Sequence, residues 1–95
     1  MAQIQLQKII KLLRRATKCG FKDIIQLLID NNVDITVNNN QVLKRATKCG
    51  FKDIIKLLID NNVDITIDNN YAIKMAEKNN YTDIVELLSK NEASL

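Results

Sequence analysis

The chain has no proline and no tryptophan, and its only two glycines are Gly20 and Gly50. A β-sandwich needs many turns that contain glycine or proline, so this composition argues against that class and favours helices joined by short connections. The chain also has no histidine, and its two cysteines, Cys19 and Cys49, do not form a C-x-x-C pair. These residues support neither a zinc site nor a disulfide framework. We therefore expect reduced thiols and no bound metal.

Large rings and long apolar runs are also scarce. The aromatic residues are two phenylalanines and two tyrosines, so we expect a core of branched aliphatic side chains, among them fourteen isoleucines. No apolar run approaches the roughly 20 residues that cross a bilayer. Residues 1–13 lack the uninterrupted apolar segment and the cleavage site of a secretory signal. These absences predict a cytoplasmic protein.

The chain lacks most of the residues and motifs that catalytic sites use. Histidine and Gly-rich phosphate loops are absent, and the carboxylates are spread along the sequence instead of converging in pairs. We therefore expect a non-catalytic protein without a cofactor.

Charge is distributed unevenly along the chain. Residues 1–22 carry six lysines and arginines and no acidic residue, so the N-terminal segment is much more basic than the overall charge of +3 indicates.

What the chain does contain is a repeat. Residues 15–36 and 45–66 are identical except for Gln26 and Lys56, and a third, diverged copy follows at the same offset of 30 residues. A period in this range is typical of stacked arrays, in which each unit covers the apolar face of its neighbours. We predict a single repeat domain over residues 1–95, with repeat 1 at about 1–37, repeat 2 at about 38–67 and repeat 3 at about 68–95.

Each copy has the pattern of a helix pair. In the second copy a short first helix ends at Gly50, which is free to adopt the left-handed conformation. Apolar spacing then predicts a second helix from about Lys52 to Asp60. The connector that follows, residues 63–70, is expected to be extended and polar. Asparagine tolerates positive φ better than other non-glycine residues, so we expect it just after helices, at Asn32, Asn62 and Asn80.

The first copy begins with a longer helix. Apolar residues recur at helical spacing without any breaker from Ala2 to Lys18, and the opposite face is basic. Such a helix is typical of a cap that covers the flank of the next repeat. The same pattern also occurs in basic helices that bind an anionic membrane or the groove of a regulator, which stays open as an alternative.

The order of helix, glycine turn, helix and link resembles the ankyrin repeat. Residues 46–58, ATKCGFKDIIKLL, are similar to the family's A-A-x-x-G-H-L-E-I-V-x-x-L-L, and residues 62–65, NVDI, are similar to its G-A-D-V. Residues 41–44, QVLK, stand where the family has T-P-L-H, and the period is 30 residues instead of about 33. The resemblance implies an all-α, ankyrin-like α-solenoid of three helix-turn-helix repeats with shortened connectors in place of β-hairpin fingers. In this respect the chain resembles the shorter, Asn-rich repeats of large-virus ankyrin arrays.

Stacking turns the 30-residue period into columns of equivalent side chains. Two of these columns are basic, one formed by Arg14, Lys44 and Lys74 and the other by Lys18, Lys48 and Lys78. By resemblance to the family, the residues just before the glycine and those of the connector turns line a concave groove that contacts partners. The predicted partner-binding residues are Arg14, Lys18, Cys19, Asn39, Asn40, Lys44, Lys48, Cys49, Asn69, Asn70, Tyr71, Lys74, Lys78 and Asn79.

Three functions remain open from the sequence. The first is a non-catalytic protein–protein interaction module whose concave groove binds another protein, with an acidic partner as the expected chemistry. The second is binding of a polyanion, either nucleic acid or an anionic membrane, through the basic first helix and the lysine columns. Nucleic acid is disfavoured, because no aromatic residues flank the lysines and a net charge of +3 is low. The third is end-to-end self-association of a structural repeat unit through uncovered residues such as Leu12 and Val85.

Overall fold

The computed structural model describes residues 2–93 and, within them, the side chains of residues 5–91. In this part of the chain the helices are joined by turns and short connectors, and there is no β-strand. Both helices whose bounds were expected from the sequence, the long first one and the second one of the middle copy, are confirmed. The helices are α1 (Ala2–Lys18), α2 (Lys22–Asp30), α3 (Val37–Cys49), α4 (Lys52–Asp60), α5 (Ile67–Lys78) and α6 (Thr82–Ala93).

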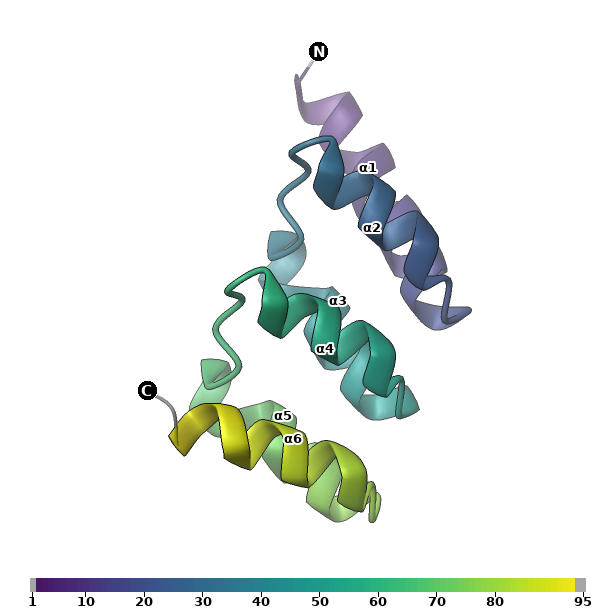
Figure 1. Ribbon diagram of the computed structural model, residues 1–95. Coiled ribbons are helices and arrows are strands. Elements are labelled where there is room, and N and C mark those ends of the chain that lie inside the picture. The colour runs from purple at the N-terminus through teal and green to yellow at the C-terminus, as the bar shows by residue number, and fades with distance from the viewer. Residues whose placement is uncertain (1, 94–95) are drawn as a thin grey trace.

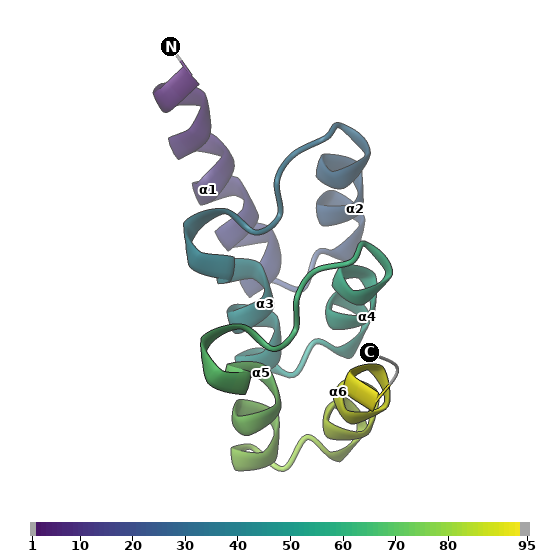
Figure 2. The same cartoon turned by 90° about the vertical axis from the view of Figure 1, so that its left-hand side faces the viewer.

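The helices form three pairs that follow one another along a single axis (Figure 1). We call α1, α3 and α5 the first helices and α2, α4 and α6 the second helices of these pairs. The first helices form one layer and the second helices form the other (Figure 2). The molecule measures 41 × 26 × 23 Å, as expected for a short stack that is longest along its axis. The predicted all-α solenoid of stacked helix pairs is confirmed.

The two layers are packed unequally. Neighbouring first helices contact each other more extensively than neighbouring second helices do. The contact between repeats is therefore more extensive on the side of the first helices, which is the side expected from the sequence to line the concave groove. The N-terminal half of α1 extends beyond the rest of the stack (Figure 2).

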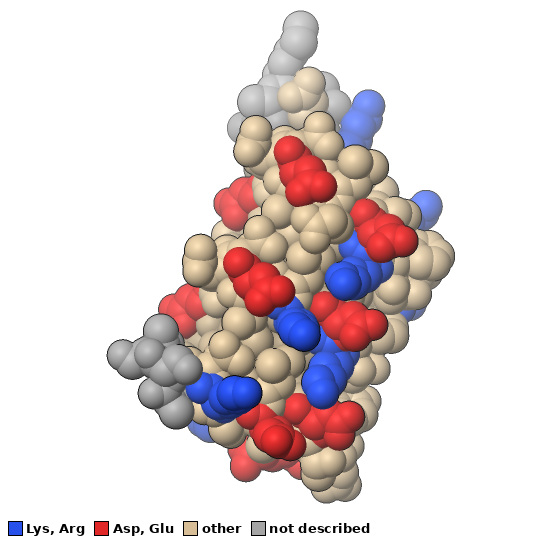
Figure 3. All heavy atoms as spheres, in the orientation of Figure 1, with Lys and Arg blue, Asp and Glu red and all other residues tan. Residues whose placement is uncertain are grey.

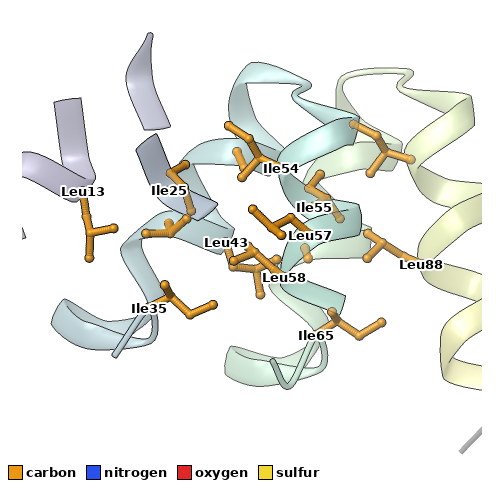
Figure 4. Packing of buried hydrophobic residues seen from close by; sticks show 14 of the residues in the cluster. Leu13, Ile25, Ile35, Leu43, Ile54, Ile55, Leu57, Leu58, Ile65 and Leu88 are labelled. Atoms are coloured by element: carbon orange, nitrogen blue, oxygen red, sulfur yellow. The ribbon is translucent and has the colours of Figure 1, made fainter. Parts of the chain in front are cut away.

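The core is a continuous column of aliphatic side chains between the layers (Figure 4). The middle repeat is covered best, since α4 buries four large aliphatic residues, whereas α2 buries only Ile25. The segments 21–30 and 51–60 differ at a single position, so their local sequence does not explain this difference. It arises because α4 has a neighbour on each side and α2 has one on only one side.

The glycine turns are also contact points between repeats. Gly20 and Gly50 have φ of 73° and 78°, in the left-handed region that glycine enters without a steric penalty. A β-carbon at Gly20 would lie 3.1 Å from the ring of Phe51, and one at Gly50 would lie 3.0 Å from the ring of Tyr81. Each glycine therefore serves both the turn and the close approach of an aromatic ring from the next repeat.

The asparagines expected after helices adopt the left-handed conformation, with φ of 65°, 63° and 59° at Asn32, Asn62 and Asn80. That prediction is confirmed. An adjacent asparagine supplies a side-chain bond: the amide of Asn61 donates to the carbonyl oxygen of Leu57 at 2.8 Å, and the same bond recurs thirty residues earlier and later. Two asparagines therefore end α2 and two end α4. The first donates a side-chain hydrogen bond to the last turn of the helix, and the second adopts the left-handed backbone conformation.

The expectation that the connectors are extended and polar is wrong. Ile35 and Ile65 are buried in the core, so each connector turns inward at its centre. Asp34 anchors the first of these turns, because its Oδ1 accepts hydrogen bonds from the hydroxyl and the amide of Thr36 at 2.6 and 2.9 Å, and both bonds recur thirty residues later. The hydroxyl bond, followed by the amide bond, lowers the pKa of the carboxyl group in both connectors.

A left-handed turn begins each of the later first helices. Residues 38–40 of α3 have φ of 56–58° and ψ of 41–49°, and residues 68–70 of α5 have φ of 51–63° and ψ of 39–50°. A left-handed backbone costs most L-amino acids about 1–2 kcal/mol per residue, but asparagine and aspartate tolerate it better. All six of these residues are Asn or Asp. The sequence predicted a shortened turn at this place, and its left-handed form is a new observation.

Polar residues replace the usual repeat residues at the C-terminal end of the stack. Thr17 and Thr47 are fully buried where the next repeat covers them, and Glu77 occupies the equivalent position of the last repeat. Asn80 likewise stands where the earlier repeats have glycine, and it shares one surface with Glu77 and Glu86. Polar side chains at these positions suit a face that no other described repeat covers.

The N-terminal end of the stack is apolar. Leu12, Phe21 and Leu27 have 43, 53 and 60% of their surface exposed, whereas Leu57, which is equivalent to Leu27, is 6% exposed. In the middle repeat this face is covered by the repeat before it. The first repeat therefore presents to solvent the same apolar face that is covered in its near-identical neighbour.

Candidate functional site

Charge divides between the two helix layers. The first helices carry ten lysines and arginines and two acidic residues, whereas the second helices and the connectors carry four basic and nine acidic residues. On the face formed by the second helices, basic and acidic side chains alternate (Figure 3). The layer of first helices is therefore strongly basic, although the whole chain has a net charge of only +3.

All of the predicted partner-binding residues lie on the first helices or next to their ends, and none of them is buried. The structure brings four of them together around one hollow: Asn39, Lys44, Lys48 and Tyr71. The others follow the same layer outside this hollow. They are Arg14, Lys18, Cys19, Asn40, Cys49, Asn69, Asn70, Lys74, Lys78 and Asn79.

The hollow has a volume of about 250 Å³ and lies in the middle repeat. The left-handed turn forms one wall, α3 forms the base, and the start of α5 forms the other wall. The base is cationic, and the wall formed by the turn carries side-chain amides. The lining residues are Asn38, Asn39, Gln41, Lys44, Arg45, Lys48 and Tyr71.

Lys44 is held within the hollow by the next repeat. Its Nζ forms an ion pair with Asp68, the first residue of the second left-handed turn, and lies 5.5 Å from the ring centroid of Tyr71. Both partners come from the repeat that follows along the chain. Lys44 is therefore a link between repeats, and its charge is largely neutralised before any partner binds.

Stacked helix pairs joined by glycine turns are the architecture of a repeat array. A family model for ankyrin repeats in three copies matches residues 13–95. The chain belongs to the ankyrin repeat family. Comparison with curated proteins and with solved structures found no match. Ankyrin repeats are in general protein–protein interaction modules and are typically non-catalytic.

Three residues that line the hollow of this ankyrin array were not among the predicted partner-binding residues. Arg45 and Gln41 lie one turn apart on α3, and Asn38 lies in the left-handed turn. The signal for Arg45 was in the sequence, because Arg15 and Arg45 are equivalent positions of the two near-identical copies. The sequence indicated Gln41 and Asn38 less clearly, because their positions depend on whether the backbone of residues 38–40 is left-handed or right-handed.

The described residues also bear on thiol chemistry, metal binding and membrane insertion. Cys19 and Cys49 are exposed free thiols. Within residues 2–93, histidine, cysteine and acidic side chains do not gather into a set of three that could hold a metal ion. The helices of the same residues are too short or too polar to span a membrane.

Proposed function

We propose that this ankyrin array is a non-catalytic, cytoplasmic module that binds an acidic protein through the concave surface of its first helices. The observation that carries the proposal is the segregation of charge, with ten of the fourteen basic residues on that layer. A partner of opposite charge is attracted along the whole layer, and this attraction weakens as salt is added.

An acidic protein suits this surface better than a nucleic acid does. Positive charge falls along the stack, because α1 carries five basic residues and no acid, α3 carries three and none, and α5 carries two of each kind. The evenly spaced phosphates of a duplex would meet no net positive charge on α5. Tyr71 already has Lys44 over its ring and does not offer a free platform for a base.

The proposal is tested by affinity capture from a native lysate with two matched triple variants. The first variant changes Lys18, Lys48 and Lys78 of the first-helix layer to glutamine. The second changes Lys22, Lys52 and Lys56 of the second helices to glutamine, which removes the same charge from the other face. We expect the first variant to recover the captured protein about tenfold less than the wild type, and the second to recover it normally.

Two outcomes would contradict this proposal. An equal loss in both variants would mean that net charge, and not the concave surface, governs binding. Displacement of the captured protein by duplex DNA, together with salt-sensitive binding of that DNA at two salt concentrations, would instead favour a polyanion as the ligand.

We infer self-association as a second candidate function, because the N-terminal end is apolar. Phe21 is 53% exposed, whereas the ring of Phe51 is seated on Gly20 of the preceding repeat. The C-terminal end does not offer a matching seat, since Asn80 has a β-carbon where a ring would have to lie. Two copies would therefore meet through their first repeats, as a closed pair with twofold symmetry.

Sedimentation velocity at rising protein concentration tests this second candidate. High salt screens the basic α1 helices from each other, so we expect a dimer under these conditions. Leu27→Lys should return the monomer, and it should keep the fold because Leu27 is 60% exposed. A wild-type chain that stays monomeric at every concentration would exclude the candidate.

A further inference from the structure

We propose that the hollow of the middle repeat binds a single carboxylate side chain of the protein partner, with Arg45 and Lys48 as its cations. This inference rests on the proposed function and makes it more specific. It names one place on the concave surface where the partner is held, and it names the chemical group that is held there.

Arg45 is the central observation. Its side chain is half-buried at the base of the hollow, and among the described residues it forms no hydrogen bond and no ion pair. A guanidinium group that is partly removed from water without a counter-ion is unfavourable, and a carboxylate satisfies it through two parallel hydrogen bonds. The group that completes this site is therefore an anion with two oxygens in one plane.

Two further donors face the same space and are free. The side chains of Lys48 and Asn39 line the hollow, and neither forms a hydrogen bond or ion pair within the described part of the chain. Lys44 is excluded from this role because Asp68 already neutralises it. The site thus offers one guanidinium, one ammonium and one amide to an incoming carboxylate.

The wall of the hollow is tied to the first repeat and is therefore held in place. The amide of Asn38 donates to Oε1 of Gln41 at 3.0 Å, and the amide of Gln41 donates to the carbonyl oxygen of Ile10 on α1 at 2.8 Å. These bonds join the left-handed turn to the neighbouring helix. A preorganised wall lowers the entropy that is lost when a side chain is bound.

The other two repeats lack this combination, although the first two copies are nearly identical. Arg15 is equivalent to Arg45, but α1 is continuous from Ala2 and has no left-handed turn before it. The third repeat has the turn, but Met75 replaces the arginine. Among the described residues this combination therefore occurs once, which gives a repetitive surface a single point of recognition.

The size of the hollow suits a single side chain of the partner. The volume of about 250 Å³ is below the roughly 300–1,000 Å³ of pockets that hold whole small molecules, so it suits one side chain. Asp68 stands at the start of α5, next to Tyr71 of the hollow's wall. Because Lys44 pairs with Asp68, that carboxylate adds little net charge to the hollow, and Arg45 and Lys48 are the cations left for a ligand.

The site is tested by nuclear magnetic resonance on the full chain, with N-acetyl-glutamate N-methylamide as the carboxylate probe. We expect saturable shifts of the Nε–Hε signal of Arg45 and of the side-chain amide of Asn39. Arg45→Lys should weaken binding of the probe about fivefold or more, since lysine cannot form the bidentate pair. Arg15→Lys is the matched control and should leave the titration unchanged.

Three outcomes would overturn the assignment. These are the absence of a saturable shift, an equal response at Arg15, and tighter binding of inorganic phosphate or of a phosphoserine probe than of the carboxylate probe. Thermal unfolding of both variants checks that neither has lost its fold. Because the probe reports on the hollow alone, the assignment can fail while the concave surface still captures a protein.

Discussion

Leu57→Ala is expected to lower the free energy of unfolding by about 2–5 kcal/mol, the range for truncating a buried leucine. Leu57 is 6% exposed and faces the space between α2 and α4, so its removal leaves a cavity between two repeats. A domain of this size has a total stability of only about 5–15 kcal/mol. Urea unfolding monitored by circular dichroism should therefore show a transition at clearly lower denaturant concentration.

The matched control for this substitution is Leu27→Ala. Leu27 has nearly the same sequence neighbours as Leu57, but it is 60% exposed. Substitutions at exposed positions usually change stability by less than about 0.5 kcal/mol. Equal losses in the two variants would mean that the second helices do not stack in the described order.

The second large effect is expected from replacing all three asparagines of residues 38–40 by alanine. Alanine lacks the side-chain amide that makes the left-handed region tolerable, so we expect a loss of about 1 kcal/mol per position and roughly 3 kcal/mol in total. The hollow next to the turn should open at the same time. Thermal unfolding measures the loss, and the probe titration at Arg45 reports the change in the hollow.

The control for this turn is the triple glycine variant. In a right-handed helix, glycine is less stable than alanine by about 0.5–1 kcal/mol per residue. In a left-handed turn the order is reversed, because glycine has no β-carbon to oppose positive φ. A triple alanine variant that is more stable than both the glycine variant and the wild type would show that residues 38–40 continue the right-handed helix.

Most of the fold follows from the repeat itself. The 30-residue period, Gly20 and Gly50, and the apolar spacing of Lys52–Asp60 predicted stacked helix pairs, and the structure has them. The burial of Ile35 was missed because a single apolar residue between polar ones gives no periodic signal. Its direction is set by the turn that Asp34 anchors, and such a turn is a local hydrogen-bonding feature more than a pattern of hydropathy.

The candidate site was predicted less completely than the fold. The 30-residue period predicted that Lys44 and Lys48 lie in basic columns on the first helices. A periodic pattern does not show how equivalent residues differ in their contacts from one repeat to the next. It did not indicate that Lys44 pairs with Asp68 whereas Arg45 stays unpaired. These differences depend on the left-handed turns, and the sequence pattern of three polar residues does not distinguish one hand from the other.

The separation of charge between the two helix layers also bears on how fast a partner arrives. Because most cations lie on one side and most carboxylates on the other, the molecule has an electric dipole moment that points across the stack. An approaching acidic surface exerts a torque on such a dipole and turns the concave side towards itself before contact. Such orientation raises the association rate constant and makes it fall with ionic strength, while dissociation depends much less on salt.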